Sequence, residues 1–247
     1  MKKLLASAAV IFGIAGFAAG PAQAAPQLGL YLTMDGSGSI DTTEFAAQVT
    51  AYNNALNSVF SSNPSLFGQV AISAGIFGAD FAEFFAVQEI TNSTILGNLM
   101  SAISGLIPGR AGINTGSTAI GDAITASATS LLTYETNLGS ALKLIIDVTT
   151  DGQNNTGSDP ATVAGNLTPS PIDAINCLGI GGGANCSFVT TSGAGTAFGA
   201  ADFAGLEAAL TEKLEIETGT VPEPATLGLV GLGLVGMGLA ARRRKAA

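Results

Sequence analysis

Five oxygen-bearing side chains stand at positions where they could share one cation. Asp35, Ser37 and Ser39 alternate directly after an apolar run, Thr118 follows a Gly-rich loop, and Asp151 ends a second apolar run. Alternate residues of a turn can direct their oxygens at one point. Carboxylate and hydroxyl oxygens are hard ligands, which suit Mg²⁺ best and are compatible with Mn²⁺ or Ca²⁺. These residues therefore predict a divalent-cation site in which two carboxylates balance the charge of the ion.

The alternative is that these residues only cap turns, as Asp and Ser often do. Capping does not require all five to converge, so we favour the metal site. Asp147, four residues before Asp151, is expected to hydrogen-bond a neighbouring loop or Lys143 rather than to bind metal. Asn154 and Asn155 could contact a ligand or shape the turn after Asp151, and we favour turn shaping.

The composition excludes several kinds of chemistry. The 247 residues contain no His, which removes Ser-His-Asp and Cys-His catalysis and every His-ligated zinc site. A metal-assisted enzyme would need an Asp or Glu as its general base. We therefore expect a protein that is not an enzyme.

The charge is strongly asymmetric along the chain. Residues 25–220 hold three basic side chains against 17 acidic ones, so their net charge is 3 − 17 = −14. Such a domain repels nucleic acid and anionic membrane surfaces, and it suits a cation. Nucleic acid is therefore not an expected partner.

Strand-like and helix-like patterns alternate through the middle of the chain. Apolar runs predict strands, and apolar residues at helical spacing predict helices. The strands are expected at 28–34, 69–77, 81–90, 141–149 and 172–180, the helices at 45–59, 92–106, 118–132 and 202–217, and Gly/Ser-rich loops at 181–183 and 192–199. This alternation predicts an α/β fold of three layers, a doubly wound and mostly parallel sheet with helices on both faces. In such folds ligands bind beyond the carboxyl ends of the strands, where the candidate metal residues lie.

Three loops resemble the metal-ion-dependent adhesion site (MIDAS) of von Willebrand factor A (vWA) domains. They are MDGSGSI, GSTAIGDAI and LIIDVTTDG, in the order that the family has them, and the resemblance spans Pro26 to Glu217. It implies a vWA-like, Rossmann-like fold. It also implies that Ser37 and Ser39 bind the metal directly, that Thr118 and Asp151 bind it directly or through water, and that Asp35 acts through water.

A closer resemblance is to an uncharacterised bacterial vWA-like family, a domain of unknown function. It rests on FAAQVTAYNNALNSVF, INCLGIGG and a D-G-x-N-N loop, which is Asp151-Gly152-Gln153-Asn154-Asn155 in this chain. No defined activity comes with this family, so the resemblance narrows the fold more than the function.

The C-terminal stretch VPEPATLGLVGLGLVGMGLAARRRK resembles the PEP-CTERM sorting signal of Gram-negative bacteria. The Pro-Glu-Pro box of this signal is Val221-Pro222-Glu223-Pro224. An apolar segment at 225–241 and a basic cluster follow it. The resemblance implies recognition by an exosortase, transient anchoring in the inner membrane by a short transmembrane segment, and delivery to the cell surface or the exopolysaccharide matrix. An ordinary C-terminal anchor is the alternative.

Residues 1–24 have the pattern of a secretory signal peptide. Lys2 and Lys3 precede an apolar stretch, and Ala22-Gln23-Ala24 has the form of a cleavage site. The alternative is a retained membrane anchor. The expected division is therefore a signal peptide at 1–24, a vWA-like domain at 25–217 and the sorting signal at 218–247.

Cys177 and Cys186 are the two cysteines of the chain. An exported protein meets an oxidising compartment, which favours a disulfide bond across the short Gly-rich segment between them. Two buried thiols are the alternative.

These observations predict an exported surface or extracellular-matrix protein with an adhesion role. Its vWA-like domain would bind a divalent cation and, through it, an acidic ligand on a protein or an exopolysaccharide. The alternative is a structural matrix component in which the metal site only stabilises the fold.

Overall fold

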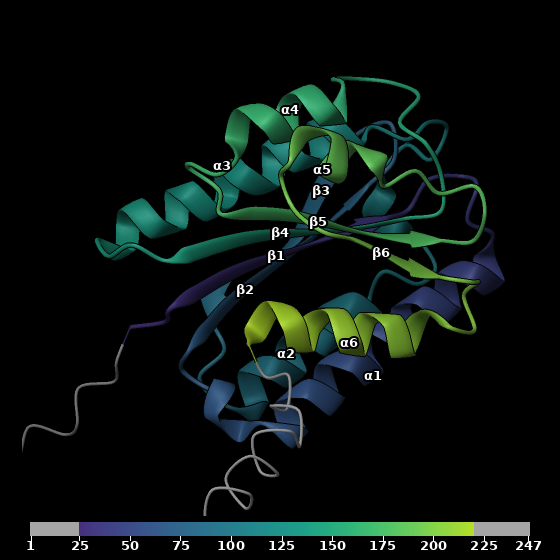
Figure 1. Ribbon diagram of the computed structural model, residues 1–247. Coiled ribbons are helices and arrows are strands. Elements are labelled where there is room, and N and C mark those ends of the chain that lie inside the picture. Colours follow the sequence, from purple (N-terminus) through teal and green to yellow (C-terminus); the bar gives the residue numbers. More distant parts are fainter. Residues whose placement is uncertain (1–24, 220–247) are drawn as a thin grey trace, which may run out of the picture.

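The central sheet is built from apolar segments that are buried on both faces. The computed structural model describes residues 25–219, and six strands pair in the order β3-β2-β1-β4-β5-β6 (Figure 1). Every residue of β1 (Leu28–Asp35) and β2 (Val70–Phe77) is buried. Such continuous apolar strands are typical of parallel sheets that helices cover on both sides.

The strands are parallel except at one edge. β1 pairs in parallel with β2 and β4 (Lys143–Thr150), and β5 (Ala174–Ile180) continues the parallel sheet to β6 (Ala197–Ala200). Only β3 (Phe81–Glu89) runs antiparallel, as a hairpin with β2. The prediction of a doubly wound, mostly parallel sheet is therefore confirmed.

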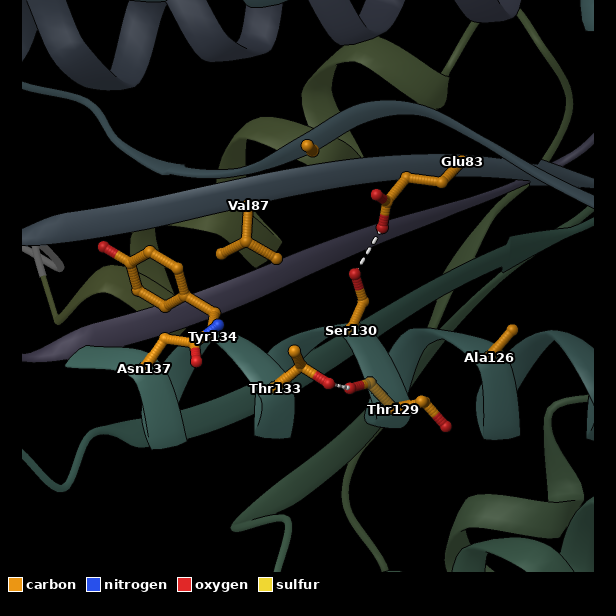
Figure 2. Close-up of a pocket in the computed structure, with 9 residues that line it drawn as sticks. Glu83, Val87, Ala126, Thr129, Ser130, Thr133, Tyr134 and Asn137 are labelled. Atoms are coloured by element: carbon orange, nitrogen blue, oxygen red, sulfur yellow. Dashed lines mark hydrogen bonds between the residues drawn. The ribbon is translucent and has the colours of Figure 1, made fainter. Parts of the chain in front are cut away.

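Helices cover both faces of this sheet. α1 (Thr42–Ser62), α2 (Ser93–Ser104) and α6 (Leu206–Thr218) lie on one face (Figure 1). The opposite face is covered by α3 (Ile120–Leu138), α4 (Pro160–Leu167) and α5 (Ser187–Ser192). Two apolar clusters fill the spaces between the layers, one on each side of the sheet. A groove remains between the edge strand β3 and α3 (Figure 2).

The structure differs from the sequence prediction in the bounds of several helices and in three elements that were not expected. α1 covers Thr42–Ser62 rather than 45–59, and α6 begins at Leu206 rather than at 202. α3 begins at Ile120, two residues after Thr118, and continues to Leu138 rather than 132. α4, α5 and β6 were not expected, and β6 with the end of α5 lies where a Gly/Ser-rich loop was predicted. α4, α5 and β6 are only eight, six and four residues long, so each is too short to show a clear apolar period. β6 is held in the sheet by its pairing with β5.

Three predicted segments lie outside the described residues: the signal peptide, the Pro-Glu-Pro box and the apolar segment at 225–241. Within residues 25–219, no helix has the length and hydropathy needed to cross a membrane.

Candidate metal centre

The candidate site lies where the direction of strand order reverses. From β1 the chain moves outward to β2 on one side, whereas β4 lies on the other side of β1 and leads to β5. β1 ends at Asp35, and Asp151 directly follows the end of β4. Because β1 and β4 are parallel neighbours, their carboxyl ends meet at the same edge of the sheet. Ligands in doubly wound folds bind at this reversal point.

Asp35 holds the first loop and the end of β4 together. Its side chain is completely buried. Oδ1 accepts a hydrogen bond from the backbone N–H of Ser37 at 2.8 Å, and Oδ2 accepts one from Thr150 Oγ1 at 2.6 Å. Both carboxylate oxygens are therefore engaged inside the protein, which fits a residue that acts on a metal indirectly.

Three oxygens from two distant loops form a continuous row. Ser37 Oγ lies 3.1 Å from Ser39 Oγ, and Ser39 Oγ donates to Asp151 Oδ1 at 2.6 Å. Neighbouring ligands of an octahedral ion bound at ~2.1 Å are about 3 Å apart. The spacing of these oxygens is close to that separation, so the donor set fits a small hard cation.

Thr118 reaches the same place from the second loop, which precedes α3. A Cβ atom built on Gly152 would lie 3.7 Å from Ser39 Oγ and 4.0 Å from Thr118 Oγ1. The three loops surround a hollow of about 270 Å³, lined among others by Ser37, Ser39 and Thr118. Ser37 and Thr118 are buried, Ser39 is exposed, and Asp151 is partly buried. The structure therefore brings together all five residues singled out from the sequence.

The two carboxylates of the site are held in an unfavourable electrostatic environment. Burial raises the pKa of Asp35 to about 6, against the opposing effect of its hydrogen bonds from Thr150 and Ser37. Burial also raises the pKa of Asp151, although the hydrogen bond from Ser39 and the charge of Arg110 favour its ionised form. A bound cation would stabilise both carboxylates in their ionised form.

No group of three or more His, Cys, Asp or Glu side chains suited to a metal ion occurs in residues 25–219. A cation at this site would therefore depend on two carboxylates and on hydroxyl oxygens. That donor set favours hard cations over the transition metals that select imidazole or thiolate.

Asn154 and Asn155 fasten the third loop to the start of α3. Asn155 Oδ1 accepts from the N–H of Thr118 at 2.8 Å, and the N–H of Asn155 donates to the carbonyl of Thr118 at 3.0 Å. Asn154 Oδ1 accepts from the N–H of Gly121 at 3.4 Å. These contacts agree with the prediction that both residues shape the loop.

Three further residues support the site and were not singled out from the sequence. Thr150 accepts from the N–H of Gly152 at 3.2 Å besides binding Asp35. Gln48 of α1 is buried and donates to the carbonyl of Asp35 at 2.8 Å. Arg110 donates to four carbonyls of the first loop and lies over the Phe45 ring. The only sequence signal for Arg110 was its isolation as a cation in an acidic domain.

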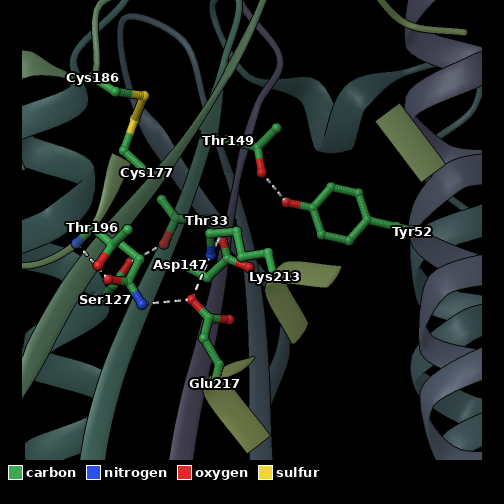
Figure 3. Close-up of polar contacts among 11 residues, drawn as sticks. Thr33, Tyr52, Ser127, Asp147, Thr149, Cys177, Cys186, Thr196, Lys213 and Glu217 are labelled. Atoms are coloured by element: carbon green, nitrogen blue, oxygen red, sulfur yellow. Dashed lines mark hydrogen bonds and ion pairs between the residues drawn. A yellow bond between two sulfur atoms is a disulfide. The ribbon is translucent and has the colours of Figure 1, made fainter. Parts of the chain in front are cut away.

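Asp147 has a different partner from the one expected. It forms an ion pair with Lys213 of α6 at 2.5 Å, whereas a neighbouring loop or Lys143 was predicted (Figure 3). Lys213 also contacts Glu217 Oε1 at 2.5 Å, and all three side chains are buried. The sequence could not reveal this pairing because α6 follows β4 by more than 50 residues and packs beside it only in the folded chain.

Cys177 and Cys186 form the predicted disulfide bond (Figure 3). It joins β5 to the residue that precedes α5, and its Cα atoms are 5.5 Å apart. The bond therefore closes the Gly-rich loop that follows β5, on the side of the sheet that α5 covers.

The topology, the helix layers and the three converging loops are those of a vWA-like domain. The family described as "Protein of unknown function (DUF1194)" matches residues 25–220, and the chain belongs to this vWA-like family. The PEP-CTERM protein-sorting motif matches residues 220–245 and indicates an exported protein. The comparison with curated proteins gave no match.

Solved structures from several organisms share this fold. One is proximal thread matrix protein 1 from the mussel byssus with a zinc-occupied MIDAS motif, at 18% identity and a TM-score of 0.60 over 80% of this chain and 49% of that chain. A von Willebrand factor type A protein from Catenulispora acidiphila is 17% identical, with a TM-score of 0.61 over 79% of this chain and 43% of that chain. Manganese-loaded TRAP protein of Plasmodium vivax is 23% identical, with a TM-score of 0.55 over 74% of this chain and 72% of that chain. The chain thus spans about half or less of the mussel and Catenulispora proteins, and at these identities the similarity shows the fold alone.

Proposed function

We propose that this protein is an exported surface or matrix protein that uses a divalent cation to bind an acidic ligand. Ser37, Ser39, Thr118 and Asp151 would hold the cation, and Asp35 would act through water. The observation that carries the proposal is the 2.6 Å contact between Ser39 Oγ and Asp151 Oδ1, residues 112 positions apart that only the folded chain brings together.

The residues present suit a cation that retains affinity for a further anion. The three hydroxyls add no charge, so two carboxylates face the two positive charges of the ion. A bound Mg²⁺ would supply a positive centre to which an external carboxylate can bind. The Asp35 carboxylate accepts a hydrogen bond from the N–H of Ser37 and so holds Ser37 in place. Ser39 is exposed, which leaves the site open to a partner. Uronic acids of an exopolysaccharide or acidic side chains of a protein have this chemistry.

Two of the structural neighbours are consistent with such a site. The mussel protein has zinc in its MIDAS motif, and the Plasmodium protein was loaded with manganese. Both ions accept oxygen ligands, but the donor set of this chain contains no nitrogen or sulfur, which favours Mg²⁺.

Substitution of Asp151 tests the metal site directly. Asp151→Ala should abolish Mg²⁺ binding at micromolar metal in isothermal titration, because it removes one of the two charges opposite the ion. Ser37→Ala should weaken binding less, since it removes a neutral ligand. Asp202→Ala removes an exposed carboxylate before α6 and serves as the control. Mg²⁺ binding by Asp151→Ala equal to that of the wild type would show that the five residues only cap turns.

A structural role in a matrix is the second candidate, and the similarity to a thread matrix protein favours it. The metal would then stabilise the fold without contacting a partner. A pull-down from the native matrix, with and without a chelator, distinguishes the two functions. Loss of the captured ligand while circular dichroism shows a folded domain supports adhesion. Capture that is unchanged by the chelator supports the structural role.

We also infer the processing of the chain from its two ends. Residues 1–24 would be removed on export, and an exosortase would cleave near the Pro-Glu-Pro box after transient anchoring in the inner membrane. The intact mass of native protein tests this. A mass that still includes the basic cluster at 242–245 in most molecules would refute exosortase cleavage.

A further inference from the structure

The loop between β5 and α5, residues 181–186, lies against the third loop of the candidate metal centre. The N–H of Asn185 donates to the carbonyl of Gly152 at 2.9 Å. A Cβ atom built on Gly183 would lie 3.0 Å from the carbonyl oxygen of Asp151. The loop therefore contacts the backbone of the metal loop at two successive residues. It contains none of the five candidate ligands, so it can act on a cation only through the position of Asp151.

Gly152 lies between this loop and the row of candidate ligand oxygens. A Cβ atom on Gly152 would lie 3.7 Å from Ser39 Oγ, which donates to Asp151 Oδ1 at 2.6 Å. On the side of β4, the N–H of Gly152 donates to Thr150 Oγ1 at 3.2 Å. Mg²⁺ requires near-ideal octahedral geometry. A shift of the Asp151–Gly152 backbone would therefore lower the affinity of the site for this ion.

The loop is fixed at both of its ends. At its start, the N–H of Gly181 donates to the carbonyl of Ala200 at 2.9 Å. At its end, the disulfide bond joins Cys186 to Cys177 of β5 (Figure 3). Three of the six residues are glycine, which loses more conformational freedom on ordering than any other residue. A cross-link restricts such a segment, so the bond helps to hold the N–H of Asn185 against the metal loop.

α5 would still anchor the end of the loop in the absence of the disulfide bond. Phe188 and Val189 are buried, and Asn185 Oδ1 accepts from the N–H of Ser187 at 3.0 Å. Loss of the bond should therefore loosen the loop without unfolding the domain. The metal centre should be weakened rather than lost.

We propose that the Cys177–Cys186 bond positions the third metal loop, so that the centre reaches its full affinity for Mg²⁺ only after the two cysteines are oxidised. This inference rests on the proposed metal site and adds regulation to it. When the bond forms, the two thiols lose two protons and two electrons, which a disulfide oxidant takes up as it becomes two thiols. The exported protein would thus complete its metal centre in an oxidising compartment and not in the reducing cytoplasm.

Calorimetric Mg²⁺ titration of the purified exported protein, before and after reduction, tests the proposal. Thiol labelling verifies that both cysteines are reduced, and circular dichroism verifies that the domain remains folded. The reduced protein should bind Mg²⁺ roughly tenfold more weakly, as is typical when the support behind a metal ligand is removed. Reoxidation should restore the affinity. Equal affinity in the two forms would overturn this proposal alone, whereas no Mg²⁺ binding by the oxidised protein would overturn the metal site as well.

Amide hydrogen exchange in the metal-free protein provides a second measurement. The N–H of Asn185 should exchange faster in the reduced protein than in the oxidised one. The N–H of Lys143, which donates to the carbonyl of Gln27 at 2.9 Å at the opposite end of β4, is the control and should not change. An unchanged exchange rate at Asn185 would overturn the proposal, because the loop would then be ordered without the bond.

A matched pair of glycine variants tests the contact while the disulfide bond is intact. Neither Gly182 nor Gly183 has a positive φ, so alanine is compatible with both backbones. A Cβ atom on Gly183 would crowd the Asp151 carbonyl, whereas one on Gly182 meets nothing within 4 Å. Gly183→Ala should therefore weaken Mg²⁺ binding several-fold, and Gly182→Ala should leave it unchanged. Equal affinity of the two variants would show that the loop does not position Asp151.

Discussion

Asp35 illustrates how one buried residue controls the candidate metal centre. Its carboxylate lies under the first loop and is not exposed to solvent. Burial favours the protonated form and raises its pKa to about 6, whereas Thr150 and Ser37 stabilise the ionised form by hydrogen bonds. The protonation of Asp35, together with that of Asp151, whose pKa burial also raises, therefore sets how much negative charge the site offers to a cation.

We expect metal affinity to depend on pH near 6 for this reason. Above pH 6 Asp35 is ionised in the metal-free protein and favours a cation. Below pH 6 a proton must leave before the metal binds, so the apparent affinity should fall by up to about tenfold per pH unit. Mg²⁺ titrations at pH 5, 6, 7 and 8 measure this. Affinity that is constant from pH 5 to 8 would contradict a role for Asp35.

At the scale of elements, the segment between α2 and α3 positions the first metal loop. Arg110 and Ala111 have φ values of +44° and +54°, a left-handed conformation that is uncommon outside glycine. This backbone directs the Arg110 guanidinium to the carbonyls of Gly36 and Ser37, at 2.9 and 2.8 Å, and of Ile40, at 2.6 Å. The strained turn and the arginine together join two of the three site loops.

Arg110→Lys should therefore weaken both stability and metal binding. An ammonium cannot reproduce the planar fork that contacts several carbonyls at once. We expect a loss of about 1–3 kcal/mol in the free energy of unfolding and several-fold weaker Mg²⁺ binding. Denaturant titration and calorimetry measure the two effects. Lys143→Ala, at the start of β4 and exposed, is the control and should change neither.

At the scale of the whole molecule, a buried ionic cluster holds α6 against the sheet. Lys213 contacts Asp147 of β4 and Glu217, and Asn176 of β5 donates to Glu217 Oε1 at 2.8 Å (Figure 3). Two carboxylates share one ammonium, and Asp147 Oδ2 and Glu217 Oε2 have no hydrogen-bond partner among the described residues. A net negative charge in the interior is unfavourable. A proton on one carboxyl would remove it.

This cluster predicts a fall in stability as pH rises towards 7. Burial and the charge of Asp147 raise the pKa of Glu217 to about 7, against the opposing charge of Lys213. In the unfolded chain Glu217 loses its proton near pH 4.5, whereas the folded protein keeps it until about pH 7. The stabilisation by this proton is thus complete below pH 4.5 and is lost between pH 4.5 and 7.

Glu217→Gln isolates this contribution. The amide cannot titrate, so the pH dependence of the free energy of unfolding should be flatter than in the wild type between pH 5 and 7. Urea titrations at pH 5, 6, 7 and 8 give the free energy of unfolding of both proteins. Both proteins retain Asp35, so its contribution cancels when the two values at each pH are subtracted. Parallel curves for the two proteins would show that Glu217 is ionised throughout in the folded state.

The sequence by itself determined the fold class and the composition of the candidate metal centre. Apolar strands alternate with amphipathic helices, and this periodicity depends on local side-chain chemistry, which is written directly in the residue order. Asp35 and Asp151 could be placed at strand ends for the same reason. The short elements α4, α5 and β6 escaped prediction because their local preferences are weak.

The tertiary structure alone decided which side chains meet. The partners of Asp147 and Arg110, and the support that Thr150 gives to Asp35, join segments that are 66 to 115 residues apart. The groove beside β3 likewise needs α3 to lie next to an edge strand from another part of the chain. Such contacts depend on how the layers pack, and periodicity along the chain holds no information about the pairing of polar groups across them.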